Sequence, residues 1–250
     1  MNVNERIAAL RKLMEEKGID IYIVPTADFH QSEYVGEYFK ARKYITGFSG
    51  SAGTAVITKE EAKLWTDGRY FIQAAAQIAG SCVELMKMGE PGVPTLDEYV
   101  KQTLTEGGTV GFDGRVVTMT DGCGYQEMAE EKNGKILYGE DLIDRIWEDR
   151  PELSKEPVFA LDIQYTGETT KSKLERIREV MKECGATSHV LTTLDDICWT
   201  LNIRGNDIEF FPLVLSYAII TEDHVKLYID ELKLSDEIKA SFEEDGITVH

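Results

Sequence analysis

Cysteine is scarce in this sequence, and the few cysteines are not arranged for cross-links. They lie at positions 82, 123, 184 and 198, and none belongs to a Cys-x-x-Cys pair. This spacing argues against a zinc ribbon and against a small disulfide framework. It is typical of a cytoplasmic protein whose thiols stay reduced. Cys82 and Cys198 lie within apolar stretches, which predicts that both are small core residues.

Basic residues and long apolar runs are also in short supply. Lysine and arginine total 27 against 45 aspartates and glutamates, so the formal net charge is −18. This charge repels polyanions, which argues against nucleic acid and anionic membrane surfaces as partners. No apolar run approaches the ~20 residues that cross a membrane. The first residues lack the basic-then-apolar pattern of a signal peptide, so we expect a cytoplasmic location.

Well-known catalytic signatures are missing as well. The sequence has neither a His-Glu-x-x-His zinc motif nor a Gly-x-Ser-x-Gly nucleophile elbow. Its histidines are scattered, at positions 30, 189, 224 and 250, with no carboxylate cluster at metal-ligand spacing around them. The best carboxylate pair, Asp195-Asp196, directly precedes an apolar segment, and helix capping explains it more simply than acid–base catalysis. The residues alone therefore predict no catalytic group and no metal ligand.

Helix and strand patterns nevertheless cover most of the chain. Of its 250 residues, 42% are hydrophobic, enough for a core in one large or two ordinary domains. Asn2 and Glu5 form a capping box for a first helix, which Gly18 is placed to end. Further helices are expected at 70–78, 95–105, 126–132, 141–147 and 235–244, and strands at 21–24, 54–58, 63–65, 82–86, 109–112, 136–138 and 247–250. This mixture predicts an α/β fold, with mixed sheets covered by helices.

The turn at 66–69 lies at the centre of the first half. A strand pair at 54–58 and 63–65 leads through Thr-Asp-Gly-Arg into the helix at 70–78. Asp67 is expected to hydrogen-bond the turn, and Gly68 to supply a backbone position at positive φ. Arg69 would then project at the carboxyl end of a strand, where α/β folds often bind ligands. The alternative is that Arg69 is an ordinary solvated turn residue.

Two loops border this turn in the sequence. The long loop at 26–42 carries His30, Tyr34 and Tyr38, which together with Arg69 are candidates to line a cleft. The alternative is a packed surface loop. The glycine-rich segment at 47–53 lacks the Gly-Lys-Ser/Thr ending of a phosphate loop, and strand-like residues follow it. We therefore predict that it is a tight connection between strands.

The chain repeats itself beyond a charged segment at 148–157 that contains two prolines. With an offset of 167 (181 − 14), Arg11 falls on Arg178 and Gly18 on Gly185. With an offset of 163 (220 − 57), the strand pair at 57–65 falls on 220–228. Two copies of one helix–strand–strand–strand–helix unit explain both matches, although shared periodicity by chance is the alternative. We expect domain boundaries of 1–153 and 154–250.

The two copies differ in ways that bear on function. The second has Asp-Glu-Leu at 230–232 where the first has Asp-Gly-Arg at 67–69, so the exposed arginine is unique to the first copy. The first copy continues for about sixty residues past the point where the second stops. A chain that ends on a strand with nothing to cover the sheet is expected to be incomplete in its second domain.

Several longer motifs together resemble one family. They include His-Gln-Ser-Glu-Tyr at 30–34, Gly-Phe-Ser-Gly-Ser-Ala-Gly-Thr at 47–54, Trp-Thr-Asp-Gly-Arg-Tyr-Phe at 65–71, Ile-Trp-Glu-Asp-Arg-Pro at 146–151 and Ser-Tyr-Ala-Ile-Ile at 216–220. Over nearly its whole length the chain is similar to the N-terminal part of three-domain aminopeptidase P, the Xaa-Pro aminopeptidases of the pita-bread metallopeptidases. In these enzymes two tandem creatinase-like N-terminal domains precede the catalytic domain.

The resemblance carries specific expectations. It implies hydrolysis of the N-terminal residue from short peptides with proline second, in a full-length enzyme that holds two metal ions, usually manganese. A homodimer is one candidate assembly of that enzyme, and the dimer contacts of the family lie largely outside this chain. The metal ligands belong to a third domain, so none falls on this chain. One residue carries over: Arg69, which the resemblance implies reaches toward the active site and contacts the bound peptide.

We therefore expect a non-catalytic N-terminal region of a cytoplasmic, metal-dependent Xaa-Pro aminopeptidase, inactive alone. Its first domain would restrict substrate access and supply Arg69 as a substrate-binding residue. The alternative is a free-standing peptide-binding or protein-interaction module without a catalytic domain.

Overall fold

The structure, a computed structural model, describes residues 1–250, and packing divides the chain into two units. The first unit comprises residues 1–33 and 38–151, and the second comprises residues 34–37 and 152–250. Residues 148–157, where the two prolines lie, form neither helix nor strand. Each unit has its own sheet and its own buried core.

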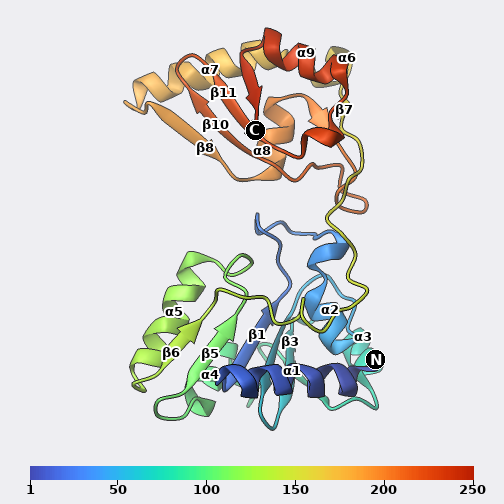
Figure 1. The fold of residues 1–250 in the computed structure, drawn as a ribbon, viewed down its shortest axis with the longest axis vertical. Coiled ribbons are helices and arrows are strands. Elements are labelled where there is room, and N and C mark those ends of the chain that lie inside the picture. Colours follow the sequence, from blue (N-terminus) through green and yellow to red (C-terminus); the bar gives the residue numbers. More distant parts are fainter. The chain divides into compact units, whose positions relative to one another are not determined.

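A six-stranded mixed sheet forms the centre of the first unit (Figure 1). Its strands, in spatial order, are β4 (Val83–Lys87), β3 (Ala62–Thr66), β2 (Thr54–Thr58), β1 (Ile21–Pro25), β5 (Thr109–Phe112) and β6 (Lys135–Leu137). Strand β2 is antiparallel to both of its neighbours, and every other pair is parallel. All strands except β2 therefore point the same way, and their carboxyl ends meet at one edge of the sheet.

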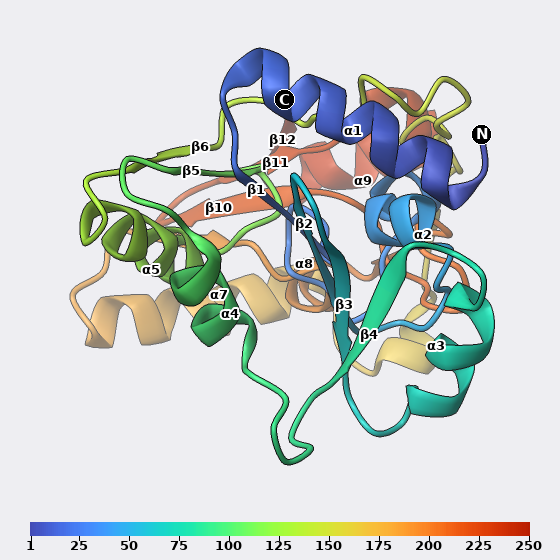
Figure 2. The same cartoon turned by 90° about the horizontal axis from the view of Figure 1, so that it is seen from below.

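Helices cover both faces of this sheet. On one face α1 (Val3–Lys17), α2 (Ala41–Thr46) and α3 (Phe71–Ile78) share a buried cluster with alternate strand residues. On the other, α4 (Leu96–Thr103) and α5 (Met119–Glu130) share a second cluster, as Figure 2 shows. A short 3₁₀ turn, η1 (Glu37–Phe39), precedes α2. Because both faces are covered, every residue of β3 is buried.

Both caps predicted for the first helix are confirmed. The Asn2 side chain accepts a hydrogen bond from the Glu5 amide at 3.0 Å, and the Glu5 carboxylate accepts one from the Asn2 amide at 2.7 Å. Gly18 ends α1 at φ 66°, where its amide donates to carbonyls of the last turn. Thr95 and Glu98 form the same reciprocal box at the start of α4.

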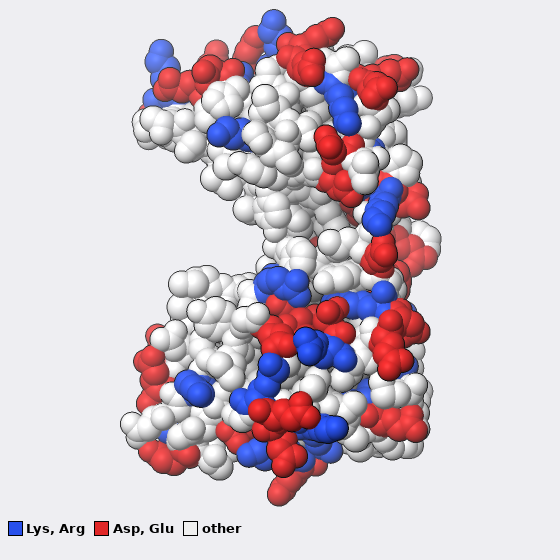
Figure 3. Space-filling model, viewed as in Figure 1, with Lys and Arg blue, Asp and Glu red and all other residues white.

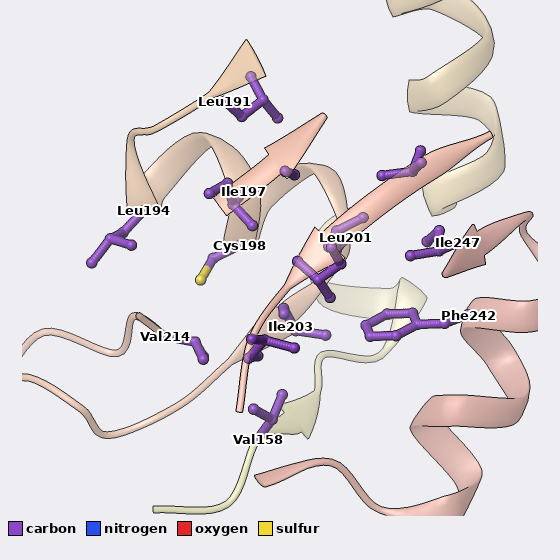
Figure 4. Close-up of a cluster of buried hydrophobic side chains, with 14 of the residues drawn as sticks. Val158, Leu191, Leu194, Ile197, Cys198, Leu201, Ile203, Val214, Phe242 and Ile247 are labelled. Atoms are coloured by element: carbon purple, nitrogen blue, oxygen red, sulfur yellow. The ribbon is translucent and has the colours of Figure 1, made fainter. Parts of the chain in front are cut away.

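The second unit has a smaller sheet of the same type. Its strands, in spatial order, are β12 (Ile247–Val249), β11 (Val225–Tyr228), β10 (Tyr217–Thr221) and β8 (Ser188–Leu191), with a separate pair of β7 (Phe159–Ala160) and β9 (Ile203–Arg204). Its helices are α6 (Ile163–Thr166), α7 (Thr170–Glu183), α8 (Leu194–Thr200) and α9 (Asp236–Glu244), with a 3₁₀ turn η2 (Glu231–Lys233). Figure 4 shows side chains from α8, α9 and β12 pointing into its core.

The structure confirms the internal repeat in topology and in detail. Strands β8, β10, β11 and β12 pair in the same order and directions as β1, β2, β3 and β4. Arg11 Nε donates to the Thr58 carbonyl at 2.9 Å, and Arg178 Nε donates to the Thr221 carbonyl at 2.9 Å. These are the residues that the two offsets align, so the two helices are pinned to their sheets by the same contact.

The second sheet lacks the cover that α4 and α5 give to the first. Its strands β10 and β11 alternate between buried and partly exposed residues, which marks one covered face and one open face.

Some local predictions were wrong. Residues 44–46 belong to helix α2, which Gly47 ends at φ 77°, so the segment at 47–53 joins a helix to a strand rather than two strands. Residues 141–147 form turns instead of a helix, because the Asp141 carboxylate bonds the Ile143 amide at 2.9 Å and diverts the backbone. Helix α5 begins at residue 119, well before the expected 126. Cys82 is exposed, whereas Cys198 is buried as predicted.

Candidate functional site

The turn that follows β3 presents Arg69 to solvent. The Asp67 carboxylate accepts the Arg69 amide at 3.0 Å, which confirms the predicted turn bond. The same carboxylate accepts two hydrogen bonds from the guanidinium, from Nε at 2.9 Å and from Nη2 at 3.0 Å. The pKa of Asp67 is held below its ordinary value chiefly by these hydrogen bonds. Gly68 does not adopt positive φ, so that expectation was wrong.

The held guanidinium still has a free edge. The Arg69 side chain is 67% exposed, and its Nη1 has no hydrogen-bond partner within the chain. Asp67 binds the side of the guanidinium formed by Nε and Nη2. The outer edge of the guanidinium, formed by Nη1 and Nη2, therefore remains available to another acceptor. The pKa of Arg69 is raised by its bonds to Asp67, so the group stays charged. The geometry is that of a pre-oriented cation.

A neighbouring aromatic side chain fixes the base of the turn. The Arg69 guanidinium lies 5.3 Å from the centre of the Tyr70 ring. The Tyr70 hydroxyl lies 2.6 Å from Ser51 Oγ, and its ring packs edge-on against Phe48 at 5.7 Å. Ser51 and Phe48 both lie in the glycine-rich segment at 47–53, so this segment holds Tyr70, and with it the turn, in position.

Arg42, which sequence reasoning missed, holds the glycine-rich segment in place. It is 3% exposed, and its guanidinium donates to the carbonyls of Phe48 and Gly50 and, at 2.9 Å, to Thr26 Oγ1. The guanidinium also lies over the Phe48 ring at 4.5 Å. Burial lowers the pKa of Arg42. Nothing in the sequence distinguishes Arg42 from the basic residues on either side of it.

A cavity of about 480 Å³ lies beside the turn, at the carboxyl edge of the first sheet. Its floor comes from the ends of β1, β3 and β4 and the start of β2, and its rim from the starts of α4 and α5. This is the position where sheets of this kind bind ligands. Asp67 lines the cavity but Arg69 does not.

The loop residues proposed to join Arg69 do not line this cavity. Tyr38 lies under the Arg150 guanidinium at 4.0 Å, and its carbonyl accepts from Arg150 Nε at 2.9 Å. Tyr34 belongs to the second unit, where it packs against Phe211. The residues of this loop that line the wall are Thr26, Ala27 and Gln31, and the Gln31 side chain donates to the Val116 carbonyl at 3.0 Å. His30, like the two tyrosines, does not line the cavity. For these tyrosines the packed-loop alternative is the better description.

A second Asp-Gly-Arg tripeptide has the same local geometry. Asp113 Oδ1 accepts from the Arg115 amide and from Arg115 Nε, both at 3.0 Å, and Oδ2 accepts from Nη2 at 2.9 Å. This turn follows β5 as the first follows β3. Arg115 is more engaged than Arg69, since it also lies over the Phe29 ring and 3.7 Å from Asp141. The repeated tripeptide was visible in the sequence and was overlooked.

The other candidate groups are structural. Asp195 and Asp196 lie in the first turn of α8, where their negative charges interact favourably with the helix dipole. The N-cap residue is Thr193, so the prediction that the two aspartates cap the helix was wrong in detail. No three His, Cys, Asp or Glu side chains lie close enough together to hold a metal ion.

None of the helices is both long and apolar enough to span a membrane. On the face in Figure 3, basic and acidic side chains are interspersed.

Comparison with known proteins assigns both halves of the chain to one family. A profile described as the creatinase/prolidase N-terminal domain matches residues 6–146, and a second profile with the same description matches residues 149–250. The chain belongs to the creatinase/prolidase N-terminal domain family. It contains two such domains in tandem, which confirms the fold expected from the resemblance.

Relatives with the same arrangement are named aminopeptidases. The solved X-prolyl aminopeptidase of Caenorhabditis elegans, described as a cytosolic enzyme with a di-nuclear active site, is 36% identical, with a TM-score of 0.93 over all of this chain and 42% of its own. Aminopeptidase P2 of Arabidopsis thaliana is 40% identical over 98% of this chain and 35% of its own. A probable Xaa-Pro aminopeptidase P of Pyricularia oryzae is 40% identical over 100% and 41%. The chain thus spans well under half the length of these relatives.

Proposed function

We propose that this chain is the N-terminal, non-catalytic region of a metal-dependent Xaa-Pro aminopeptidase of the cytoplasm. The observation that carries the proposal is the match over the whole chain to 42% of an X-prolyl aminopeptidase, at 36% identity and a TM-score of 0.93. The described side chains offer no group that fits a metal ion. The proposal therefore assigns the metals, with manganese as the expected ion, to the part of the enzyme outside this chain.

Within that enzyme, Arg69 would contact the bound peptide. A guanidinium whose Nε side is occupied by Asp67 can still donate two hydrogen bonds from its outer edge to one carbonyl or carboxylate. The bonds to Asp67 and the adjacent Tyr70 ring restrict the side chain before substrate arrives. Less rotamer entropy is then lost when the peptide binds.

The first unit would also restrict which peptides reach the active site. A folded body that presents a fixed cation on an exposed turn can select short peptides by steric exclusion of longer ones. The enzyme should then cleave Xaa-Pro peptides less efficiently as their length increases beyond a few residues. A kcat/KM that is independent of peptide length would remove this part of the proposal.

Replacing Arg69 with alanine in the full-length enzyme tests the role of the guanidinium. Loss of a charged hydrogen-bonding contact of about 1.5–3 kcal/mol should lower kcat/KM roughly ten- to hundredfold. Metal content should stay normal, because the proposal places the metal ligands outside this chain and an arginine is not among them. Arg69→Lys should recover little, since lysine lacks the planar fork.

Arg115→Ala is the matched control for this experiment. Arg115 sits in a turn of the same local geometry and is 52% exposed, so any effect of disrupting an Asp-Gly-Arg turn would appear in both variants. We expect the control to keep its peptide hydrolysis rate. Equal losses in both variants, or none in Arg69→Ala, would contradict the assigned role.

A further inference from the structure

The cavity at the carboxyl edge of the first sheet has acidic groups and no basic ones in its wall. Asp67, Asp97 and Asp121 line it, and no Lys, Arg or His does so. The charge of Asp67 is already matched by Arg69. Asp97 and Asp121 form no ion pair, and Asp121 accepts only a hydrogen bond from the Thr118 hydroxyl at 2.7 Å besides its backbone contacts. Two carboxylates at the rim therefore have no basic partner, although each lies in the first turn of a helix, Asp97 in α4 and Asp121 in α5.

A mostly buried tyrosine in the same cavity wall has a hydroxyl that forms no hydrogen bond within the chain. Tyr125 on α5 is 8% exposed, lines the cavity, and has no hydrogen-bond partner within the chain. Burial raises the pKa of Tyr125, and the negative charges of Asp121 and Asp97 add to this effect. All three residues line the cavity. The hydroxyl is therefore available to a polar group of a ligand in the cavity.

The rest of the wall is largely apolar. Trp65 lies at the floor with its indole N–H satisfied by the Pro94 carbonyl at 2.9 Å, so the ring offers only its apolar surface. Other apolar contacts come from Met88, Val116 and Val117. A volume of about 480 Å³ matches that of small-molecule sites, which are mostly apolar with a few convergent polar groups.

We propose that this cavity binds an organic cation with an apolar body, such as an amine or amidine attached to a ring or alkyl chain. The cationic head lies between Asp97 and Asp121 within reach of the Tyr125 hydroxyl, and the apolar body lies against Trp65 and the valines. A bare metal ion is a poorer occupant, because the side chains do not gather as metal ligands. The inference does not rest on the proposed peptidase function, because every lining residue belongs to this chain.

A charge series of one molecular shape tests the proposal. Benzamidine, benzamide and benzoate share a ring and a planar substituent but carry charges of plus one, zero and minus one. Binding to the 250-residue chain can be followed by protein-observed NMR, with the Trp65 indole signal as the local reporter. Benzamidine should bind with a Kd near or below about 1 mM, at least roughly tenfold tighter than benzamide, and benzoate should not bind.

Substitutions then place the site. Asp97→Asn with Asp121→Asn should weaken benzamidine binding roughly tenfold, because both exposed carboxylates lose their charge without a core being disturbed. Tyr125→Phe should weaken it by a smaller factor. Asp236→Asn, an exposed aspartate in the first turn of α9, is the matched control for the net charge of −18 and should change nothing.

Three results would overturn the proposal. Equal affinity for benzamidine and benzamide would show that charge plays no part. Equal losses in the control and in the double variant would show only general attraction to an acidic protein. Absence of saturable shifts at Trp65 up to about 10 mM would show that the cavity takes no organic cation of this size.

Discussion

Replacing Arg42 with methionine should destabilise the first unit by about 3–5 kcal/mol. Methionine keeps most of the apolar length of the side chain but removes all three hydrogen bonds. The carbonyls of Phe48 and Gly50 then lose their buried donor, and each unsatisfied buried acceptor costs about 1–3 kcal/mol. The bond to Thr26 Oγ1 and the contact with the Phe48 ring are lost as well.

Chemical denaturation can report on the first unit alone. Trp65 and Trp147 lie in that unit, whereas Trp199 lies in the second, so a Trp199→Phe background leaves tryptophan fluorescence to the first unit. A loss of this size is a large part of the 5–15 kcal/mol of a typical domain, so the urea midpoint should fall substantially at an unchanged slope. Two-state unfolding of this unit has to be checked with a second probe.

Arg145→Met is the matched control. Its side chain is 64% exposed and its one ion pair, to Glu140, spans 3.7 Å, so the change should stay within about 0.5 kcal/mol. A loss below about 1 kcal/mol in Arg42→Met would refute the view that the buried guanidinium holds the glycine-rich segment. Equal losses in both variants would point to a general effect of removing positive charge from an acidic chain.

Two further predictions concern the second unit. The Lys233–Asp207 ion pair is buried, with side chains 2% and 0% exposed, so Asp207→Ala should cost about 3–5 kcal/mol in urea unfolding, and Asp207→Leu with Lys233→Met should recover most of it. The Glu168 pKa is lowered from 4.5 to about 2, first by its hydrogen bonds from Arg176. Because the folded pKa is the lower one, this contribution is present above pH 4.5 and is lost as pH falls toward 2. The stability advantage of the wild type over Glu168→Gln should therefore vanish across that interval, and a constant difference would contradict the assignment.

Local sequence signals predicted the regular elements well. The boxes at Asn2 and Thr95 start helices because side-chain and backbone donors are satisfied within three residues, which a sequence displays directly. The internal repeat could also be predicted from the sequence. Identical residues at aligned positions make the same contact, as Arg11 and Arg178 do with the two strand carbonyls.

Features that depend on distant residues could not be predicted in this way. Gly47 looked like the start of a glycine-rich loop, but tertiary packing of Tyr44 and Ile45 makes it the end of α2. Asp141 was expected to open a helix, yet its carboxylate also binds the Arg150 guanidinium at 2.6 Å, and that contact needs the folded chain. The periodicity of hydrophobic residues in the sequence predicts neither the end of α2 at Gly47 nor the contact between Asp141 and Arg150.

The candidate site was predicted in part. The sequence placed Arg69 on an exposed turn at the carboxyl end of a strand, and the structure agrees. It grouped Arg69 with His30, Tyr34 and Tyr38, none of which lines the cavity. The two tyrosines pack elsewhere. The cavity wall was not predictable, because α4, α5 and the strand ends come together only through the sheet order.

Hydrolysis of a short Xaa-Pro peptide with added manganese tests the central claim most directly. The 250-residue chain should be compared with the full-length enzyme, as wild type and as Arg69→Ala. We predict no turnover by the 250-residue chain, clear turnover by the full-length enzyme, and a roughly ten- to hundredfold lower kcat/KM in the variant. Turnover by the 250-residue chain that a chelator abolishes, or an unchanged rate in Arg69→Ala, would contradict the account.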